Sequence, residues 1–139
     1  MKHFLILLVG ISALTITSCS TAAAEKIADE FHQKLDAGDT DYIVKNLADT
    51  EDLSEDVWTD FLDLVISWGP QTDRTKTSGF STKINNGVTT IKLGYTFNVI
   101  GYGLIHERLV LRDKGDGYKI ITALMNSDEA VVENGTAGY

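Results

Sequence analysis

Glu107 is the residue whose type and position best suit acid–base chemistry. It lies in an expected strand, residues 104–112, and on strand alternation it shares one face with Ile105, Leu109 and Leu111. That face should point into the core, where a carboxylate must be paired, hydrogen-bonded or protonated because burying an isolated charge is very costly. One hypothesis is therefore an acid or base in a pocket.

Two other interpretations of this segment remain open. Glu107 could lie at the rim of the sheet or pair with Arg74 or Arg108, because structural ion pairs also hold buried carboxylates. A bulge after Gly103 would instead turn His106 and Arg108 inward. Of these interpretations, we favour a structural role for Glu107 over a catalytic one. The candidate pocket residues are Glu107, Tyr95, Trp68 and His106.

Other reactive residues are sparse. Cys19 is the only cysteine, and His32 and His106 lie too far apart in the sequence for the spacing of a zinc site. His32 is expected on the surface of the first helix, and Trp68 is expected to pack in the core. No glycine-rich loop precedes a helix, so a phosphate cradle is unsupported. We expect neither a metal nor a cofactor.

The first nineteen residues have the pattern of a secretory leader. A short charged start is followed by an apolar run, residues 4–14, and by small residues before Cys19. The run is too short to span a membrane, which takes about 20 apolar residues. The segment Ile16-Thr17-Ser18-Cys19 resembles the lipobox of bacterial lipoproteins. This resemblance implies removal of residues 1–18 and acylation of Cys19, and two or more acyl chains hold a protein on a membrane.

An ordinary secretory signal cut after Ala24 is the alternative, because Ala22-Ala23-Ala24 is also a small-residue cleavage site. Ser20 follows Cys19, where lipoproteins retained in the inner membrane often have aspartate. We therefore expect a lipid anchor in the outer membrane of a bacterial cell envelope.

Charge is distributed unevenly along the chain, whose net charge is -8. Residues 25–63 contain 13 acidic and 3 basic residues, whereas residues 74–119 contain 3 acidic and 8 basic residues. Nucleic-acid binding is disfavoured because it needs a dense basic surface. We interpret the acidic half as a solvated helix face.

The hydrophobic period changes from helical to strand-like after Pro70. Helices are expected over residues 21–37, 40–47 and 54–68, and strands over residues 75–84, 91–99, 104–112 and 118–125. The Asn86-Gly87 pair predicts a tight hairpin.

Helices followed by an antiparallel meander predict an α+β fold for residues 19–126, with the helices on one face of a curved sheet. Residues 127–139 are expected to form a flexible tail. The expected core comprises Phe31, Leu35, Phe61, Trp68, Leu93, Phe97, Leu109 and Ile120.

The order of several short motifs resembles the nuclear-transport-factor-2-like (cystatin-like cone) superfamily, especially its short bacterial envelope members. These motifs are residues 24–39, Trp58 with Phe61, Trp68-Gly69-Pro70, residues 95–97, residues 106–111 and residues 116–120. The resemblance implies a pocket between the concave sheet face and the helices, and it allows a homodimer formed through the outer sheet face. We expect an envelope module that binds a small ligand or a partner protein without catalysis. The alternative is a small lyase, isomerase or hydrolase with Glu107 as its acid or base.

Overall fold

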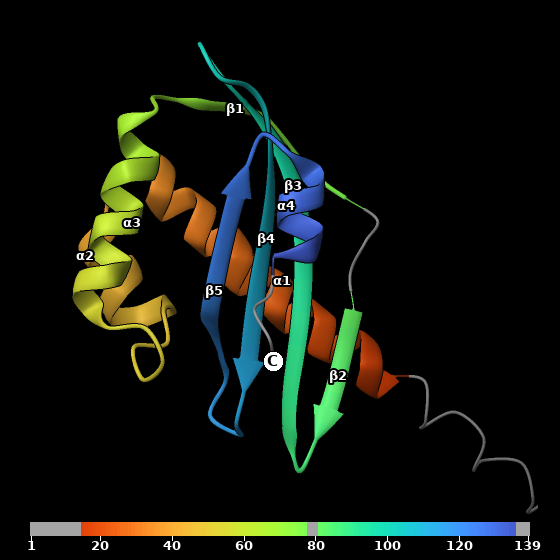
Figure 1. Cartoon of the computed structure of the whole chain (residues 1–139). Coiled ribbons are helices and arrows are strands. Elements are labelled where there is room, and N and C mark those ends of the chain that lie inside the picture. The colour runs from red at the N-terminus through yellow and green to blue at the C-terminus, as the bar shows by residue number, and fades with distance from the viewer. Residues whose placement is uncertain (1–14, 78–80, 136–139) are drawn as a thin grey trace, which may run out of the picture.

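The computed structural model describes residues 15–77 and 81–135 and shows helices packed on a curved, unclosed antiparallel sheet (Figure 1). This confirms the expected α+β cone-like fold. The helices are α1 (Thr15–Asp36), α2 (Thr40–Tyr42), the π turn η1 (Ile43–Leu47), α3 (Glu55–Ser67) and α4 (Glu129–Asn134). The strands are β1 (Gln71–Lys76), β2 (Ser81–Asn85), β3 (Val88–Val99), β4 (Gly103–Asp113) and β5 (Tyr118–Asn126).

The sheet has the order β1-β3-β4-β5, and β2 also pairs with β3. The sequence predicts one strand over residues 75–84, but the structure has two separate strands, β1 and β2, pairing with different parts of β3. The predicted hairpin after β2 is confirmed. Asn86 and Gly87 have φ angles of 51° and 76°, the positive values that a two-residue hairpin turn requires.

Strands β3 and β4 pair without interruption, which decides the orientation of the residues on β4. The register runs from Val99 opposite Gly103 to Thr89 opposite Asp113. The irregularity in the pairing of β4 with β5 lies further along, where Val110 pairs with Thr122 and Leu111 with Ile120, so the extra residue is Ile121 of β5. The alternative of a bulge after Gly103 is therefore wrong.

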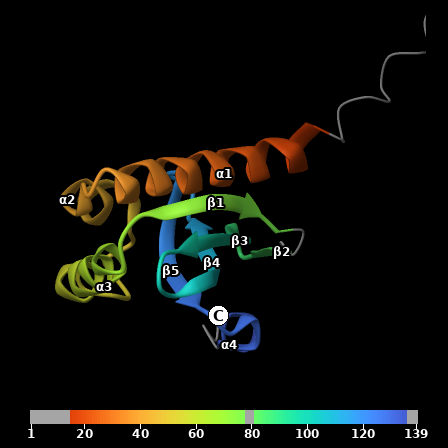
Figure 2. The same ribbon diagram turned by 90° about the horizontal axis from the view of Figure 1, so that it is seen from above.

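Helix α1 buries the stripe that its sequence period predicts: Ala24, Ala28, Phe31 and Leu35. Figure 2 shows α1 across one face of the sheet. None of the helices among the described residues has the combination of length and hydropathy needed to cross a membrane.

Helix α3 buries a different face from the one that its sequence indicates. The sequence period predicts an apolar stripe of Val57, Phe61, Leu64, Val65 and Trp68, widened by Trp58, Leu62 and Ile66. Its buried residues are Trp58, Leu62 and Val65, whereas Phe61 and Trp68 are only partly buried. The Trp58 indole N–H donates to the Asp49 carbonyl at 3.1 Å, which satisfies the polar end of that buried side chain. Phe61 and Trp68, which were predicted to belong to the core, pack against it but remain partly exposed. The helix has apolar residues on several sides, so the period alone did not identify its inner face.

The segment expected to be a flexible tail contains α4. The Asp128 side chain accepts a hydrogen bond from the Ala130 N–H at 2.9 Å, as an N-cap does, and Val132 is buried. Helix α4 contacts β4 and β5 and lies on the sheet face opposite α1 (Figure 2). Part of the outer sheet face is thus covered, and Val110 and Ile121 are buried.

The acidic and basic halves of the chain are joined by ion pairs, so the acidic half is more than a solvated face. Within residues 15–77 and 81–135, four such pairs connect it to the strands and their turns: Glu25 with Lys76, Asp36 with Arg74, Asp52 with Arg112, and Glu51 with Lys114. Because at least one partner in each pair is well exposed to solvent, each contributes little on its own, typically about 0–1 kcal/mol.

Candidate functional site

A polar row of residues crosses the inner face of the sheet. Tyr95 on β3 lies directly opposite Glu107 on β4. The row on one side is Leu93 opposite Leu109, and the row on the other is Phe97 opposite Ile105. This polar row separates a large apolar cluster beneath the helices from a smaller one formed by Phe97, Val99 and Ile105. Phe97 was predicted to belong to a single core and instead lies in the smaller cluster.

Glu107 is buried as its strand alternation predicts, and its partner is His32. The Nε2 atom of His32 lies 2.7 Å from Oε2 of Glu107, and the Glu107 side chain is 0% exposed. The expected partners do not hold it: Arg108 points to the other face of the sheet, and Arg74 is bound to Asp36. The pairing of Glu107 with an arginine is therefore wrong.

The prediction that His32 lies on the surface is also wrong, because this residue is only 5% exposed. His32 is four residues after Ala28 and three before Leu35, so it belongs to the stripe that faces the sheet. This spacing was the signal that would have placed it inside. A carboxylate on the facing strand is what allows a histidine to occupy that position.

Tyr95 packs against the histidine. Its ring lies edge-on to the His32 ring, with centroids 4.6 Å apart and an interplanar angle of 81°. Burial raises the pKa of Tyr95 above its usual value, and the negative charges of Asp29 and Glu107 raise it further. Tyr95 therefore keeps its hydroxyl proton at neutral pH and is available there as a hydrogen-bond donor.

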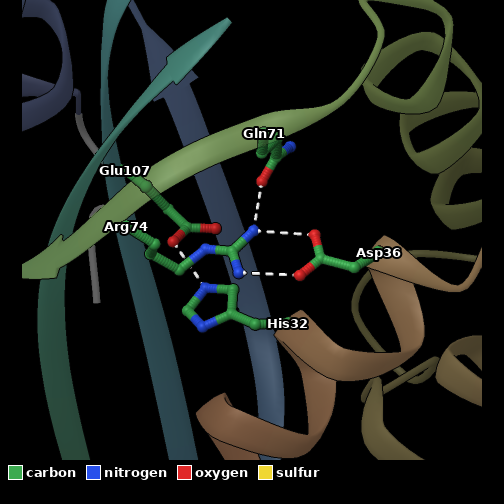
Figure 3. Close-up of polar contacts among 5 residues, drawn as sticks. All are labelled: His32, Asp36, Gln71, Arg74 and Glu107. Atoms are coloured by element: carbon green, nitrogen blue, oxygen red, sulfur yellow. Dashed lines mark hydrogen bonds and ion pairs between the residues drawn. The ribbon is translucent and has the colours of Figure 1, made fainter.

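Arg74 reaches the same site from β1 (Figure 3). Its two terminal nitrogens bind both carboxylate oxygens of Asp36, at 3.1 and 3.0 Å, and Nη2 also donates to the Gln71 side chain at 2.5 Å. The pairing of β1 with β3 is irregular between Thr72 and Thr75, and Asp73 has a φ of 55°. Such an irregularity re-aims the side chains of an edge strand.

These side chains border an open cavity of about 420 Å³ between α1, β1 and β3. It is lined by Glu25, Asp29, His32, Gln33, Asp36, Arg74, Lys76 and Tyr95. Glu107 is not part of this lining, but it contacts His32, which is. The Arg74–Asp36 and Lys76–Glu25 ion pairs both bridge β1 to α1 along its wall.

The four residues predicted to form a pocket do not converge. Tyr95 lines the cavity, and Glu107 supports it through His32. Trp68 is half-buried near Tyr102, with ring centroids 6.0 Å apart, and lies outside the cavity lining. His106 alternates with Glu107 and so points to the outer face of the sheet. Sequence reasoning missed His32 and named Arg74 only as an ion-pair partner of Glu107, because both residues come from elements remote from β4 in the chain.

The His32–Glu107 pair has a defined proton arrangement when Glu107 is ionised. An ionised carboxylate only accepts hydrogen bonds, so the Nε2 atom of His32 must carry the proton. The second ring nitrogen of a neutral His32, Nδ1, is then an acceptor. This arrangement can bind a donor or take up a proton.

Residues 15–77 and 81–135 contain no group of three or more His, Cys, Asp or Glu side chains that could hold a metal ion. Comparison with protein-family models and with curated proteins found no match for this chain. The function must therefore be argued from the site itself.

Proposed function

We propose that this protein is a binding module of the bacterial cell envelope, held on a membrane by an acylated Cys19, and that its cavity binds a small polar molecule. The observation that supports the binding role is the cavity of about 420 Å³, with the buried His32–Glu107 pair at its wall. Ligand sites in proteins have volumes of roughly 300–1,000 Å³ and contain a few converging polar groups.

The position of Ala24 supports cleavage before Cys19 over cleavage after Ala24. Ala24 is fully buried in the main core, so cleavage after it would remove a packed residue and the preceding part of α1. Ala24 lies five residues after Cys19. Five residues span about 8 Å as a helix and at most about 18 Å when extended. The anchor would therefore hold the domain close to the membrane.

An acid–base enzyme is the second candidate, and the 2.7 Å contact between His32 and Glu107 favours it. In that case His32, which lines the cavity, would exchange the proton with the substrate. Glu107 would be a positioning residue that fixes the imidazole tautomer and stabilises its protonated form. This differs from a direct acid–base role for Glu107.

Membrane fractionation and mass analysis test the anchor. We expect the wild-type protein in the membrane fraction, with a diacylglyceryl group on a mature N-terminal Cys19. The Cys19→Ala variant should not be acylated, whereas the neighbouring Ser20→Ala control should behave as wild type. A soluble mature protein that begins at Glu25 and carries no lipid would refute the proposal.

A thermal-shift screen of small polar metabolites tests the cavity. The matched variants are Asp29→Trp, which places a bulky side chain at the cavity, and Lys26→Trp, which changes an exposed position of the same helix outside the lining. Compounds that stabilise the wild type should lose their effect in Asp29→Trp and retain it in Lys26→Trp. The binding role is wrong if no compound stabilises the protein or if Asp29→Trp changes nothing.

A further inference from the structure

Helix α3 carries a second apolar stripe beside the one that it buries. Val57, Phe61, Leu64 and Trp68 follow one another at steps of four, three and four residues, and Trp68 keeps helical backbone angles at the end of the helix. Steps of this kind place side chains on one face of a helix, as the apolar positions of a coiled coil do. These four residues form the α3 seam. Val57 and Leu64 are 50% and 55% exposed, and the other two are partly exposed.

Aromatic contacts hold the seam in place. The Phe61 ring lies edge-on to the ring of the buried Trp58, with centroids 6.2 Å apart, and the Trp68 ring lies 6.0 Å from that of Tyr102 in the β3–β4 turn. Tyr102 is well exposed, so the apolar surface continues from α3 onto this turn. Figure 1 shows α3 at one edge of the molecule. An exposed apolar patch with a polar rim is typical of an interaction site.

Acidic residues line the open side of the seam. On one side, the seam is flanked by Trp58 and Val65, which are buried in the core. On the other side, helical geometry places Asp60 next to the seam, with Asp56 and Asp63 behind it, and all three are exposed. These three aspartates form no ion pair with any residue in the ranges 15–77 and 81–135. Helix α3 contains no basic residue that could neutralise them.

This charge distinguishes between the possible occupants of the seam. If a second copy of the chain packed its own α3 there, it would bring the same acidic row and no basic residue from that helix. An anionic lipid surface would be repelled for the same reason. In paired helices, the charges beside the apolar seam set the choice of partner. A helix with lysine or arginine beside its apolar face complements both the seam and its acidic rim.

We propose that the α3 seam docks another protein, and that the docking element is an amphipathic helix with basic residues beside its apolar face. The seam extends over about 16 Å, or three helical turns, which suits binding along the length of a helix. None of the four seam residues lines the cavity. This surface is therefore separate from the small-molecule site, and its test is independent of the binding role proposed for the cavity.

The experiment uses the full-length, acylated protein in phosphatidylcholine nanodiscs and two water-soluble peptides of three heptads. Both peptides have leucine at the a and d positions, and the e and g positions are lysine in one and glutamate in the other. Anisotropy of a fluorescent label on the peptide measures binding, with empty nanodiscs as the baseline. We expect the lysine peptide to bind saturably and about tenfold more tightly than the glutamate peptide.

Two pairs of variants locate the contact. Leu64→Gln should weaken binding of the lysine peptide about tenfold, whereas Ile66→Gln, on another side of the same helix, should bind as the wild type does. Asp60→Lys should weaken the lysine peptide and strengthen the glutamate peptide, each about threefold, as for an exposed charge pair. Glu55→Lys makes the same change of charge on the side of α3 away from the seam and should alter neither affinity.

Several results would overturn the proposal: no saturable binding of either peptide, equal binding of both, or unchanged affinity in Leu64→Gln. Self-association of the protein that Leu64→Gln abolishes would show that a second copy covers the seam instead. Quenching of Trp68 fluorescence by brominated lipid in the nanodisc would show that the membrane covers it. Each of these results leaves the cavity and its ligand screen unaffected.

Discussion

The His32–Glu107 pair leads to a prediction about the relative cost of removing each partner. His32→Leu leaves a carboxylate with 0% side-chain exposure and no partner for either oxygen, which should cost about 3–5 kcal/mol of the free energy of unfolding. Glu107→Met leaves an imidazole that can remain neutral with one unpaired nitrogen, which should cost about 1–3 kcal/mol. The first loss is a large share of the roughly 5–15 kcal/mol that stabilises a typical domain.

The double variant distinguishes this explanation from simple loss of packing. With both polar groups replaced by apolar ones, no buried charge is stranded, and such replacements are often neutral or stabilising. The double variant should therefore be more stable than His32→Leu alone by at least about 2 kcal/mol.

Urea denaturation of the four proteins measures these differences, provided that the m-values agree. His106→Leu serves as a matched control, because His106 lies on the outer sheet face and its replacement should change stability by less than about 0.5 kcal/mol. Additive losses in the double variant, or a greater loss for Glu107→Met than for His32→Leu, would refute the reasoning.

Three further variants test other parts of the structure. The raised pKa of Tyr95 means that the unfolded chain loses this proton first, so the contribution of Tyr95 to stability should be constant up to about pH 10 and fall above it. Urea midpoints measured against pH should therefore fall less above about pH 10 in Tyr95→Phe than in the wild type, and an equal fall would contradict the assignment. Asn86→Ala should cost about 1 kcal/mol in the same urea assay, because an alanine must adopt the φ of 51°, and no loss would mean that the turn rearranges. Trp58→Phe removes the hydrogen bond to the Asp49 carbonyl as well as buried volume, so thermal unfolding should show a loss of about 1–3 kcal/mol in the free energy of unfolding. Unchanged stability would mean that the indole does not make this hydrogen bond.

Sequence patterns predicted those parts of the fold in which local rules and burial agree. The stripe of α1, the alternation along β3 and the Asn86-Gly87 hairpin turn are of this kind. They failed in α3, because Val57 and Leu64 are as apolar as the residues that α3 buries and yet are about half exposed. Which side of such a helix faces the core depends on how it packs against α2, η1 and α1, and no local period contains that information.

The candidate site was predictable only in part for a related reason. The alternation of β4 placed Glu107 inside, but its partner lies 75 residues away on α1. A buried carboxylate requires a partner without specifying which one, and an arginine was the obvious choice on charge. Arg74 is instead directed by an irregular edge strand toward Asp36, which leaves His32 to satisfy Glu107.

The polar row of Tyr95 and Glu107 has consequences for how stability and function are related in this domain. A buried ion pair is weak evidence for stability, since apolar residues of similar volume often serve as well or better. Here the row also divides the core into two clusters and leaves two buried polar atoms without partners among the described residues. Residues that are costly for folding are commonly found at functional sites. The double variant is therefore informative beyond stability: if it is as stable as the wild type, the row is not needed for folding, and the binding role proposed for the cavity becomes the physical explanation for its presence.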